Sequence, residues 1–186
     1  ALWDTLDVGY FMRHDASEIA WHARQLSRYV AKPGETAVSD LGGKSIVRAR
    51  ISPIGEGLQI LVYTADQTDL FARICGYFDQ AGFSILDAKI HTANNGYALD
   101  TFQVVTSLLP EHYRELITMV ESGLCSTIDR QGTLPAPTKG RVSRRVKNFP
   151  IAPRITLHPD EKAQSWLLGI SASDRLGLLY SVATVL

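Results

Sequence analysis

Residues 58–106 carry the most regular pattern of hydrophobic and polar positions in the chain. The stretch begins with a β-branched and aromatic run that favours a strand: Ile60, Val62 and Tyr63. From residue 70 to residue 78 apolar side chains recur every three to four positions, which places them on one face of a helix. Asp66 or Thr68 is predicted to cap this helix by accepting a hydrogen bond from a free backbone N–H, and Gly82 suits the left-handed position that ends it.

A hairpin is predicted after this helix. Asn95-Gly96 favours a two-residue type I′ turn, which would join strands at residues 83–92 and 97–105. With that register His91 faces Asp100. We expect this pair to be an ordinary surface contact and not a catalytic one, because opposite charges on a solvated sheet face interact weakly.

A second helix is predicted from Pro110 to about Leu124, and an extra strand at residues 44–51 is predicted to pair beside the strand that begins at Leu58. From residue 58 the order is strand, helix, strand, strand, helix, which is one strand short of the ferredoxin-like βαββαβ unit. The predicted fold class is therefore α+β. Apolar residues on both hairpin faces also predict that the second face is covered, in our hypothesis by another copy of this unit.

The end of the chain repeats the middle. Asp66 aligns with Asp174 and Leu70 with Leu178, so the offset is 108 residues. Repetition of a strand pair, a turn and a helix predicts that a second unit of the same kind begins near Arg154. Because its helix stops at Leu186 without the rest of a sheet, we expect the chain to be a piece of a longer protein. The predicted organisation is helices and a linker at 1–43, a first domain at 44–131, a linker at 132–153 and the truncated start of a second domain at 154–186.

The N-terminal residues 1–31 are helical in pattern. Asp15 is a predicted N-cap, and Glu18 completes a capping box with it. His14-Asp15 is an HD dipeptide, but a metal site needs several converging ligands. The other histidines are scattered along the chain without ligand spacing: His22, His91, His112 and His158. We therefore predict no metal site, and the chain has no local motif for a catalytic triad or a phosphate-binding loop, so we predict no catalytic residue.

Residues 132–153 combine four prolines with a basic run, which is typical of a linker. The basic residues are Lys139, Arg141, Arg144, Arg145 and Lys147. Two interpretations stay open. In the first, the run is a binding site for an acidic partner or for nucleotide phosphates. In the second, which we favour, it is a solvated segment that its charges keep extended.

The balance of charges limits the kinds of partner that the chain is expected to bind. The chain has 19 acidic and 19 basic residues, so no global field points to nucleic acid or to an anionic membrane. There is no signal-peptide pattern and no apolar run long enough to span a bilayer. Two cysteines give no disulfide framework, and a cytoplasmic location is expected.

One segment carries a family resemblance. ADQTDLFARICGYFDQAGFSILDAKI, followed by ALDTFQVV, resembles an ACT domain, a small amino-acid-sensing module. Most of the chain further resembles the C-terminal region of the bacterial bifunctional uridylyltransferase/uridylyl-removing enzymes. That resemblance implies a fragment that senses glutamine and regulates the modification of the nitrogen-signalling protein PII. It implies no cofactor within this chain, Mg²⁺ and UTP for the longer enzyme, and ACT–ACT pairing within or between chains.

The resemblance also implies an effector site at the loop before each unit's helix, completed by the start of the next strand of a partner unit. In this sequence the implied residues are Asp66, Gln67, Thr68, Asp69, Leu70, Ser84, Ile85, Asp87, Asp174, Arg175, Leu176 and Gly177. Helix N-termini attract carboxylates, which suits an amino acid. ACT loops usually have glycine where Asp69 stands, and the second unit keeps it as Gly177, so the first loop is expected to be the weaker site. The alternatives are a pairing module without a ligand, a sensor for another amino acid, and an HD-type catalytic fragment.

Overall fold

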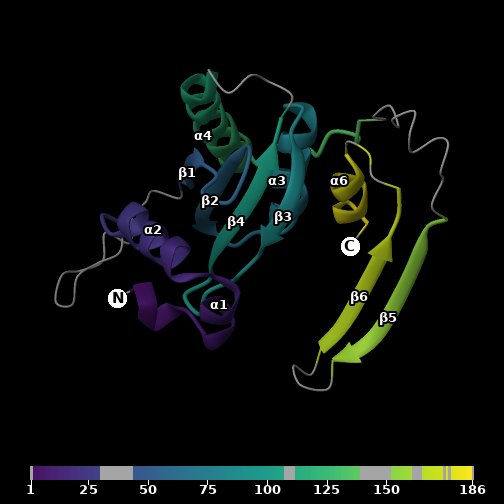
Figure 1. The fold of residues 1–186 in the computed structure, drawn as a ribbon, viewed down its shortest axis with the longest axis horizontal. Coiled ribbons are helices and arrows are strands. Elements are labelled where there is room, and N and C mark those ends of the chain that lie inside the picture. The colour runs from purple at the N-terminus through teal and green to yellow at the C-terminus, as the bar shows by residue number, and fades with distance from the viewer. Residues whose placement is uncertain are drawn as a thin grey trace.

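The computed structural model describes residues 2–29, 44–106, 112–138, 152–160, 165–173, 175 and 177–185. The chain runs through helices, a four-stranded sheet and a final two-stranded sheet (Figure 1). The elements are the 3₁₀ helix η1 (Leu2–Thr5), α1 (Val8–Arg13), α2 (Ala16–Leu26), β1 (Ile46–Ile51), β2 (Leu58–Ala65), α3 (Leu70–Gln80), β3 (Ser84–Lys89), β4 (Tyr97–Val105), α4 (Tyr113–Arg130), β5 (Arg154–Asp160), β6 (Ser165–Ser171) and α6 (Leu178–Ala183). None of the helices in these described ranges is long and apolar enough to cross a membrane.

The larger sheet is antiparallel throughout, with strand order β1-β2-β4-β3. The predicted α+β class is confirmed, and so is the extra strand, because β1 pairs directly with β2. Gly82 has φ +76°, as expected for the residue that ends α3. The second helix extends beyond its predicted end near Leu124 to Arg130, because Ile128 continues its buried stripe, and its predicted start at Pro110 lies outside the described residues.

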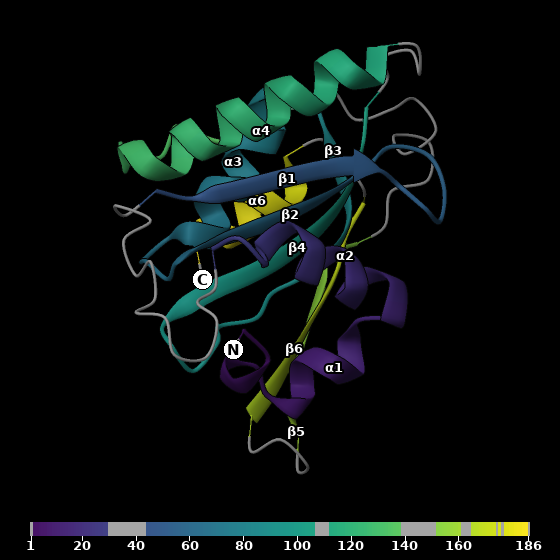
Figure 2. The same ribbon diagram turned by 90° about the vertical axis from the view of Figure 1, so that its left-hand side faces the viewer.

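The two faces of this sheet are covered by different parts of the chain (Figure 2). α3 and α4 pack on one face, where alternate residues of β2 and β4 form the main core. The N-terminal helices pack on the other face against Leu61, Tyr63 and Leu99. The second face is therefore covered, as predicted, but by α1 and α2 and not by another copy of the same unit. Because both faces are covered, most residues of β2 and β4 are buried.

The predicted hairpin register is wrong by one residue. Thr92 pairs with Ala98 and Lys89 with Thr101, so His91 does not face Asp100. A type I′ turn needs positive φ at both central residues, but only Gly96 has it, at +78°. The backbone N–H of Gly96 donates to the carbonyl of Ala93, so the loop is one residue longer than the two-residue turn.

The second hairpin reproduces the first at the predicted offset. Ile46 pairs with Tyr63, and Arg154 pairs with Ser171, which is the same register moved by 108 residues. Both following helices begin after a residue with left-handed backbone: Asp69 has φ 62° and ψ 14°, and Gly177 has φ 74° and ψ 8°. The repeat therefore extends to backbone conformation. α6 packs against α3, which joins the second hairpin unit to the first.

Gly57 gives a direct test of the turn between β1 and β2. Its φ is +93°, and a Cβ at this position would overlap the carbonyl oxygen of Val104. Gly57→Ala is expected to lower the free energy of unfolding by about 1–3 kcal/mol, because an L side chain is strained there. Gly55 lies in the same turn, and a Cβ added to it would meet no atom within 4 Å, so Gly55→Ala is the control. Equal urea midpoints for the two variants would contradict this account.

Candidate functional site

The loop before α3 does not have the predicted capping geometry. Neither Asp66 nor Thr68 is the N-cap; Asp69 is, and its side chain makes no capping hydrogen bond. A side-chain cap needs extended backbone at the N-cap, whereas Asp69 is left-handed. The Asp66 carboxylate instead accepts a hydrogen bond from the Thr92 hydroxyl at 3.4 Å, which ties the loop to the segment after β3.

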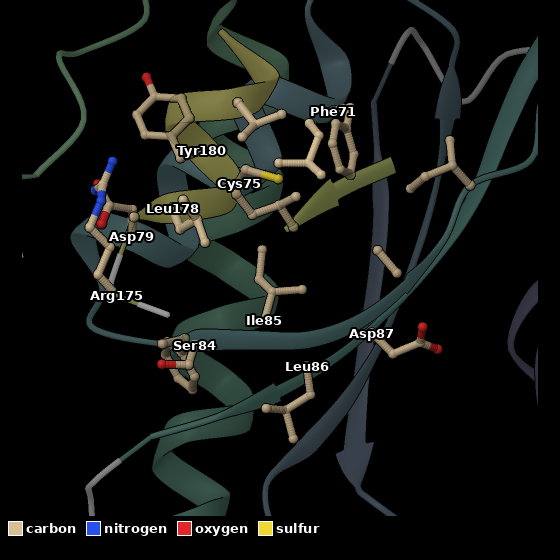
Figure 3. Close-up of a pocket in the computed structure, with 17 residues that line it drawn as sticks. Phe71, Cys75, Asp79, Ser84, Ile85, Leu86, Asp87, Arg175, Leu178 and Tyr180 are labelled. Atoms are coloured by element: carbon tan, nitrogen blue, oxygen red, sulfur yellow. The ribbon is translucent and has the colours of Figure 1, made fainter. Parts of the chain in front are cut away.

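A cavity of about 490 Å³ lies between the two repeat units (Figure 3). Its walls come from α3 and β3 of the first unit and from β6 and the start of α6 of the second. It brings together five of the residues expected at the effector site: Ser84, Ile85, Asp87, Arg175 and Gly177. Among the described residues that line it, none belongs to the first loop, residues 66–70. Asp174 and Leu176 lie outside the described residues.

The cavity combines an apolar lining with a few charged groups. Figure 3 shows Arg175 and Asp79 on one side and Asp87 on the other. An Arg175 guanidinium nitrogen donates to the Ser181 hydroxyl at 3.0 Å, which in turn donates to the Gly177 carbonyl at 2.8 Å. These two bonds hold the arginine against the first turn of α6. A cation and two carboxylates around an apolar space suit a small zwitterion.

Asp79 also lines the cavity, although the sequence pattern did not predict it. It is buried in α3, and its carboxylate accepts hydrogen bonds from the backbone N–H and the hydroxyl of Thr138 at 2.8 and 2.5 Å. A Cβ on Gly177 would lie 2.6 Å from its Oδ1 atom. Glycine at 177 therefore serves two purposes: it permits the left-handed backbone, and it leaves room for Asp79 at the edge of the cavity.

The contact between α3 and α6 sets the width of the cavity. Tyr180 is buried against Gly76, and a Cβ on that glycine would lie 2.8 Å from the tyrosine ring. The Tyr180 hydroxyl donates to the carbonyl of Pro135 at 2.5 Å. The sequence did carry a signal for this contact, since Ala72 and Gly76 are small residues one helical turn apart. Cys75 lies beside them; burial raises the pKa of its thiol to about 12, so it packs as a small neutral side chain.

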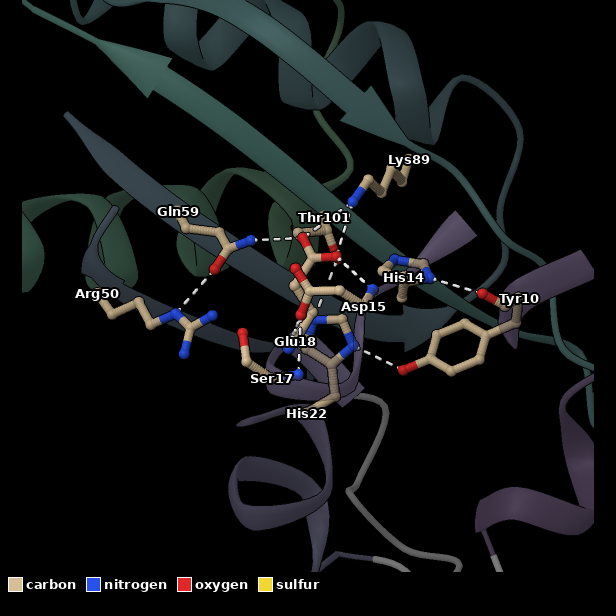
Figure 4. A network of polar contacts seen from close by, with 10 residues as sticks. All are labelled: Tyr10, His14, Asp15, Ser17, Glu18, His22, Arg50, Gln59, Lys89 and Thr101. Atoms are coloured by element: carbon tan, nitrogen blue, oxygen red, sulfur yellow. Dashed lines mark hydrogen bonds and ion pairs between the residues drawn. The ribbon is translucent and has the colours of Figure 1, made fainter. Parts of the chain in front are cut away.

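A second polar cluster lies under α2, on the opposite face of the sheet (Figure 4). Its centre is Glu18, which is buried and accepts hydrogen bonds from Gln59 at 2.7 Å and from the Lys89 ammonium at 2.7 and 2.9 Å. Gln59 accepts in turn from Arg50, whose guanidinium stacks 4.2 Å from the ring centroid of Trp21. These contacts fasten α2 to β1, β2 and β3.

The HD dipeptide has a structural role in this cluster. The predicted capping box is confirmed, with Asp15 bonded to the backbone of Glu18 and Glu18 bonded back to the backbone of Asp15. Hydrogen bonds from the backbone N–H groups of the first turn lower the pKa of Asp15. His14 is buried, and its Nδ1 atom lies 2.9 Å from the carbonyl oxygen of Tyr10. Within the described ranges no three His, Cys, Asp or Glu side chains are grouped so that they could hold a metal ion.

Asp100 differs from the surface residue that the sequence suggested. It lies at the centre of the sheet with 1% exposure, and its carboxyl accepts a hydrogen bond from the backbone N–H of His91 at 3.2 Å. Burial, with a smaller contribution from the nearby Asp66, raises its pKa to about 7. The His91 ring instead lies 3.9 Å from the carboxylate of Asp7 and against Tyr10. The predicted surface pair of His91 and Asp100 was therefore wrong.

Comparison with known proteins finds relatives that match the whole chain. Residues 1–25 match the family model described as the fifth domain of uridylyltransferase GlnD. The bifunctional uridylyltransferase/uridylyl-removing enzyme of Ralstonia nicotianae is 54% identical over 190 residues, which cover 100% of this chain and 21% of that enzyme. The enzymes of the same name from Cupriavidus metallidurans and Burkholderia thailandensis are 52% and 51% identical, again over 100% of this chain and 20% of their own length.

No solved structure matches the chain. The chain spans about a fifth of the length of the curated relatives it matches. Its whole length is homologous to a region of these enzymes, which confirms the resemblance to their C-terminal region. The chain is therefore a homologue of one region of the bifunctional uridylyltransferase/uridylyl-removing enzymes.

Proposed function

We propose that this region is a regulatory module that binds a small amino acid, glutamine by family resemblance, in the cavity between the two repeat units. Residues 44–131 are proposed to be an ACT domain of ferredoxin-like type, in which β1 occupies the sheet edge beside β2, and residues from 154 the start of a second one. The module would pass its ligand state to other parts of the enzyme, and so control the modification of PII in the cytoplasm.

One observation carries this proposal. The cavity joins the start of β3 in the first unit to the loop before α6 in the second, which are the two kinds of segment implied for an effector site. Ser84, Ile85 and Asp87 come from the strand, and Arg175 and Gly177 from the loop. ACT–ACT pairing within one chain would produce this arrangement, because each unit lacks the complementary wall.

The charges indicate how a zwitterion would bind. The Arg175 guanidinium is proposed to bind the α-carboxylate, since arginine pairs well with planar anions. Asp79 and Asp87 are the carboxylates available to the ammonium group, and the apolar walls would contact the aliphatic part of the side chain. The loop at residues 66–70 is proposed not to bind this ligand in the present arrangement. Asp69 places a carboxylate where a ligand carboxylate would have to dock.

Mg²⁺ and UTP are proposed to bind elsewhere in the longer enzyme. Among the described residues no three His, Cys, Asp or Glu side chains are grouped so that they could hold the metal ion. Uridylyl transfer and removal are proposed as activities of the longer enzyme.

Thermal unfolding with and without glutamine tests the proposal. At a hundred times its Kd, glutamine is expected to stabilise the protein by about 2.7 kcal/mol, seen as a higher midpoint. Arg175→Ala is expected to abolish the rise. Arg114→Ala, at an exposed position on α4, is the control and should keep it.

The other ligands separate the alternatives. Glutamate and asparagine should give no rise if the cavity selects glutamine, and a rise with either of them alone would identify a sensor for another amino acid. If no amino acid raises the midpoint of the folded protein, the two units form a pairing module without a ligand.

A further inference from the structure

We propose that the ion pair between Glu18 and Lys89 links helix α2 to the wall of the cavity, so that Glu18 acts as a positioning residue for that cavity. The link itself follows from the contacts of the sheet. Its effect on a ligand rests on the proposed function. Local sequence patterns do not reveal this link, because they identify Glu18 only as half of a capping box.

β3 is a wall shared by two compartments. Ala88 and Ile90 line the cavity, while Lys89 between them belongs to the polar cluster on the opposite face of the sheet. This alternation follows from the period of a strand, in which successive side chains point to opposite faces. A displacement of Lys89 therefore moves its two cavity-lining neighbours.

Glu18 is held in place by several hydrogen bonds, so a movement that separates it from Lys89 would leave its buried charge without this partner. Its carboxylate is buried with 7% side-chain exposure, and it accepts from Lys89, from Gln59 and from the backbone N–H of Asp15. A buried charge that loses its partner is strongly destabilised, so the two groups are expected to move together. Any shift of the N-terminal turn of α2 is thereby transmitted to β3.

The same strip of chain carries further contacts to the N-terminal helices. An Arg13 guanidinium nitrogen donates to the carbonyl of Ile90 at 3.3 Å, and the backbone N–H of Asn94 donates to the carbonyl of Thr5 at 2.8 Å. The chain from Lys89 to Asn94 is thus attached to η1, α1 and α2 at several points. This makes the end of β3 follow the position of those helices.

The other end of β3 pairs irregularly with β4. Its pairing with β4 shifts register between Ile85 and Asp87, and Leu86 at the irregularity is 63% exposed. A bulge leaves a residue unpaired and interrupts the hydrogen-bond ladder. Ser84 and Ile85 therefore lie beyond this irregularity, whereas Ala88 and Ile90 are direct neighbours of Lys89 and are expected to follow it most closely.

Hydrogen exchange of the ligand-free protein tests the link directly. In Glu18→Gln the backbone amides of the cavity-lining residues of β3 are expected to exchange about tenfold faster, because local opening of β3 no longer has to break the ion pair. Glu121→Gln is the matched control: Glu121 accepts one hydrogen bond from the backbone of Ala49 at 2.8 Å, at the opposite edge of the same sheet. It should leave β3 unchanged. Lys89→Arg, which keeps the charge, should retain the slow exchange.

The double variant Glu18→Gln/Lys89→Met is the control for faster exchange caused by global unfolding, because it leaves neither Glu18 nor Lys89 as an unpaired charge. It is expected to fold and to show the same faster exchange confined to β3. If β3 exchanges as slowly in the folded double variant and in Glu18→Gln as in the control, the link is refuted.

A second experiment measures the Kd for glutamine of the same variants. Glu18→Gln is expected to weaken binding by about fivefold or more, with no effect of Glu121→Gln. Faster β3 exchange without any glutamine binding to the native protein would support the link while refuting the proposed function. Unchanged exchange with normal glutamine binding would refute the link and leave the proposed function intact.

Discussion

Asp100→Asn is expected to stabilise the protein relative to the native chain by an amount that grows with pH. The folded-state pKa of Asp100 is raised from 3.8 to about 7, mainly by burial. Below pH 3.8 the carboxyl is protonated in both states and has no effect on stability. Above that pH the unfolded chain ionises while the folded one does not, so folding loses free energy until the pH passes about 7.

The expected difference between the two proteins is on the order of 4 kcal/mol at pH 8, from 1.36 kcal/mol for each tenfold change in the dissociation constant. Asparagine keeps the shape of the side chain and an oxygen that can accept the hydrogen bond from His91. Urea unfolding between pH 4 and pH 8 measures the effect. Asp87→Asn, at an exposed position of β3, is the control and should run parallel to the native curve. A constant difference between Asp100→Asn and the native protein at all pH values would contradict the argument.

The burial of Asp100 shows what a local pattern cannot reveal. The helix after residue 70, the strands on either side and the repeat offset were all predicted, because they depend on periodicity within short windows. The position of β4 at the centre of the sheet depends on pairing with β2, which lies far earlier in the chain. A residue on a central strand is buried by the neighbouring strands and helices, whatever its own charge. The sequence alone therefore predicts that a single Asp is exposed, and only the strand order shows that it is buried.

The candidate site was predictable to a similar degree. The family resemblance implied a strand segment and two loop segments, and the cavity contains the described residues of the β3 segment and of the second loop. It did not identify Asp79 or Tyr180, because their roles arise from the packing of α6 on α3. It also did not show that residues 66–70 stay out of the cavity. Which of two equivalent loops faces a given wall is decided by how the repeats pack together, and that arrangement is not encoded in either loop alone.

His22→Gln is expected to have the opposite dependence on pH. His22 is fully buried: the Tyr10 hydroxyl lies 2.7 Å from its Nδ1 atom and the Thr101 hydroxyl 3.3 Å from its Nε2 atom. Burial, with nearby positive groups, lowers its pKa from 6.5 to about 3. Above pH 6.5 the ring is neutral in both states, and as the pH falls the unfolded chain takes up a proton that the folded one excludes. The free energy of unfolding of the native protein should therefore fall by on the order of 5 kcal/mol between pH 6.5 and about pH 3 because of His22. The His22→Gln variant should not show this loss.

Between pH 3.8 and pH 6.5 the two groups act against each other, since acid removes the penalty of Asp100 while it adds that of His22. In the native protein these two contributions oppose each other, and His14 adds a further loss in acid because burial lowers its pKa as well. Each single variant should therefore differ from the native protein by the contribution of the group that it lacks. Asp100→Asn should become less stable in acid, and His22→Gln should become more stable. His158→Gln, at an exposed position of β5, is the control for histidine replacement and should follow the native curve. If both variants ran parallel to the native protein from pH 4 to pH 7, neither buried group would control the acid response.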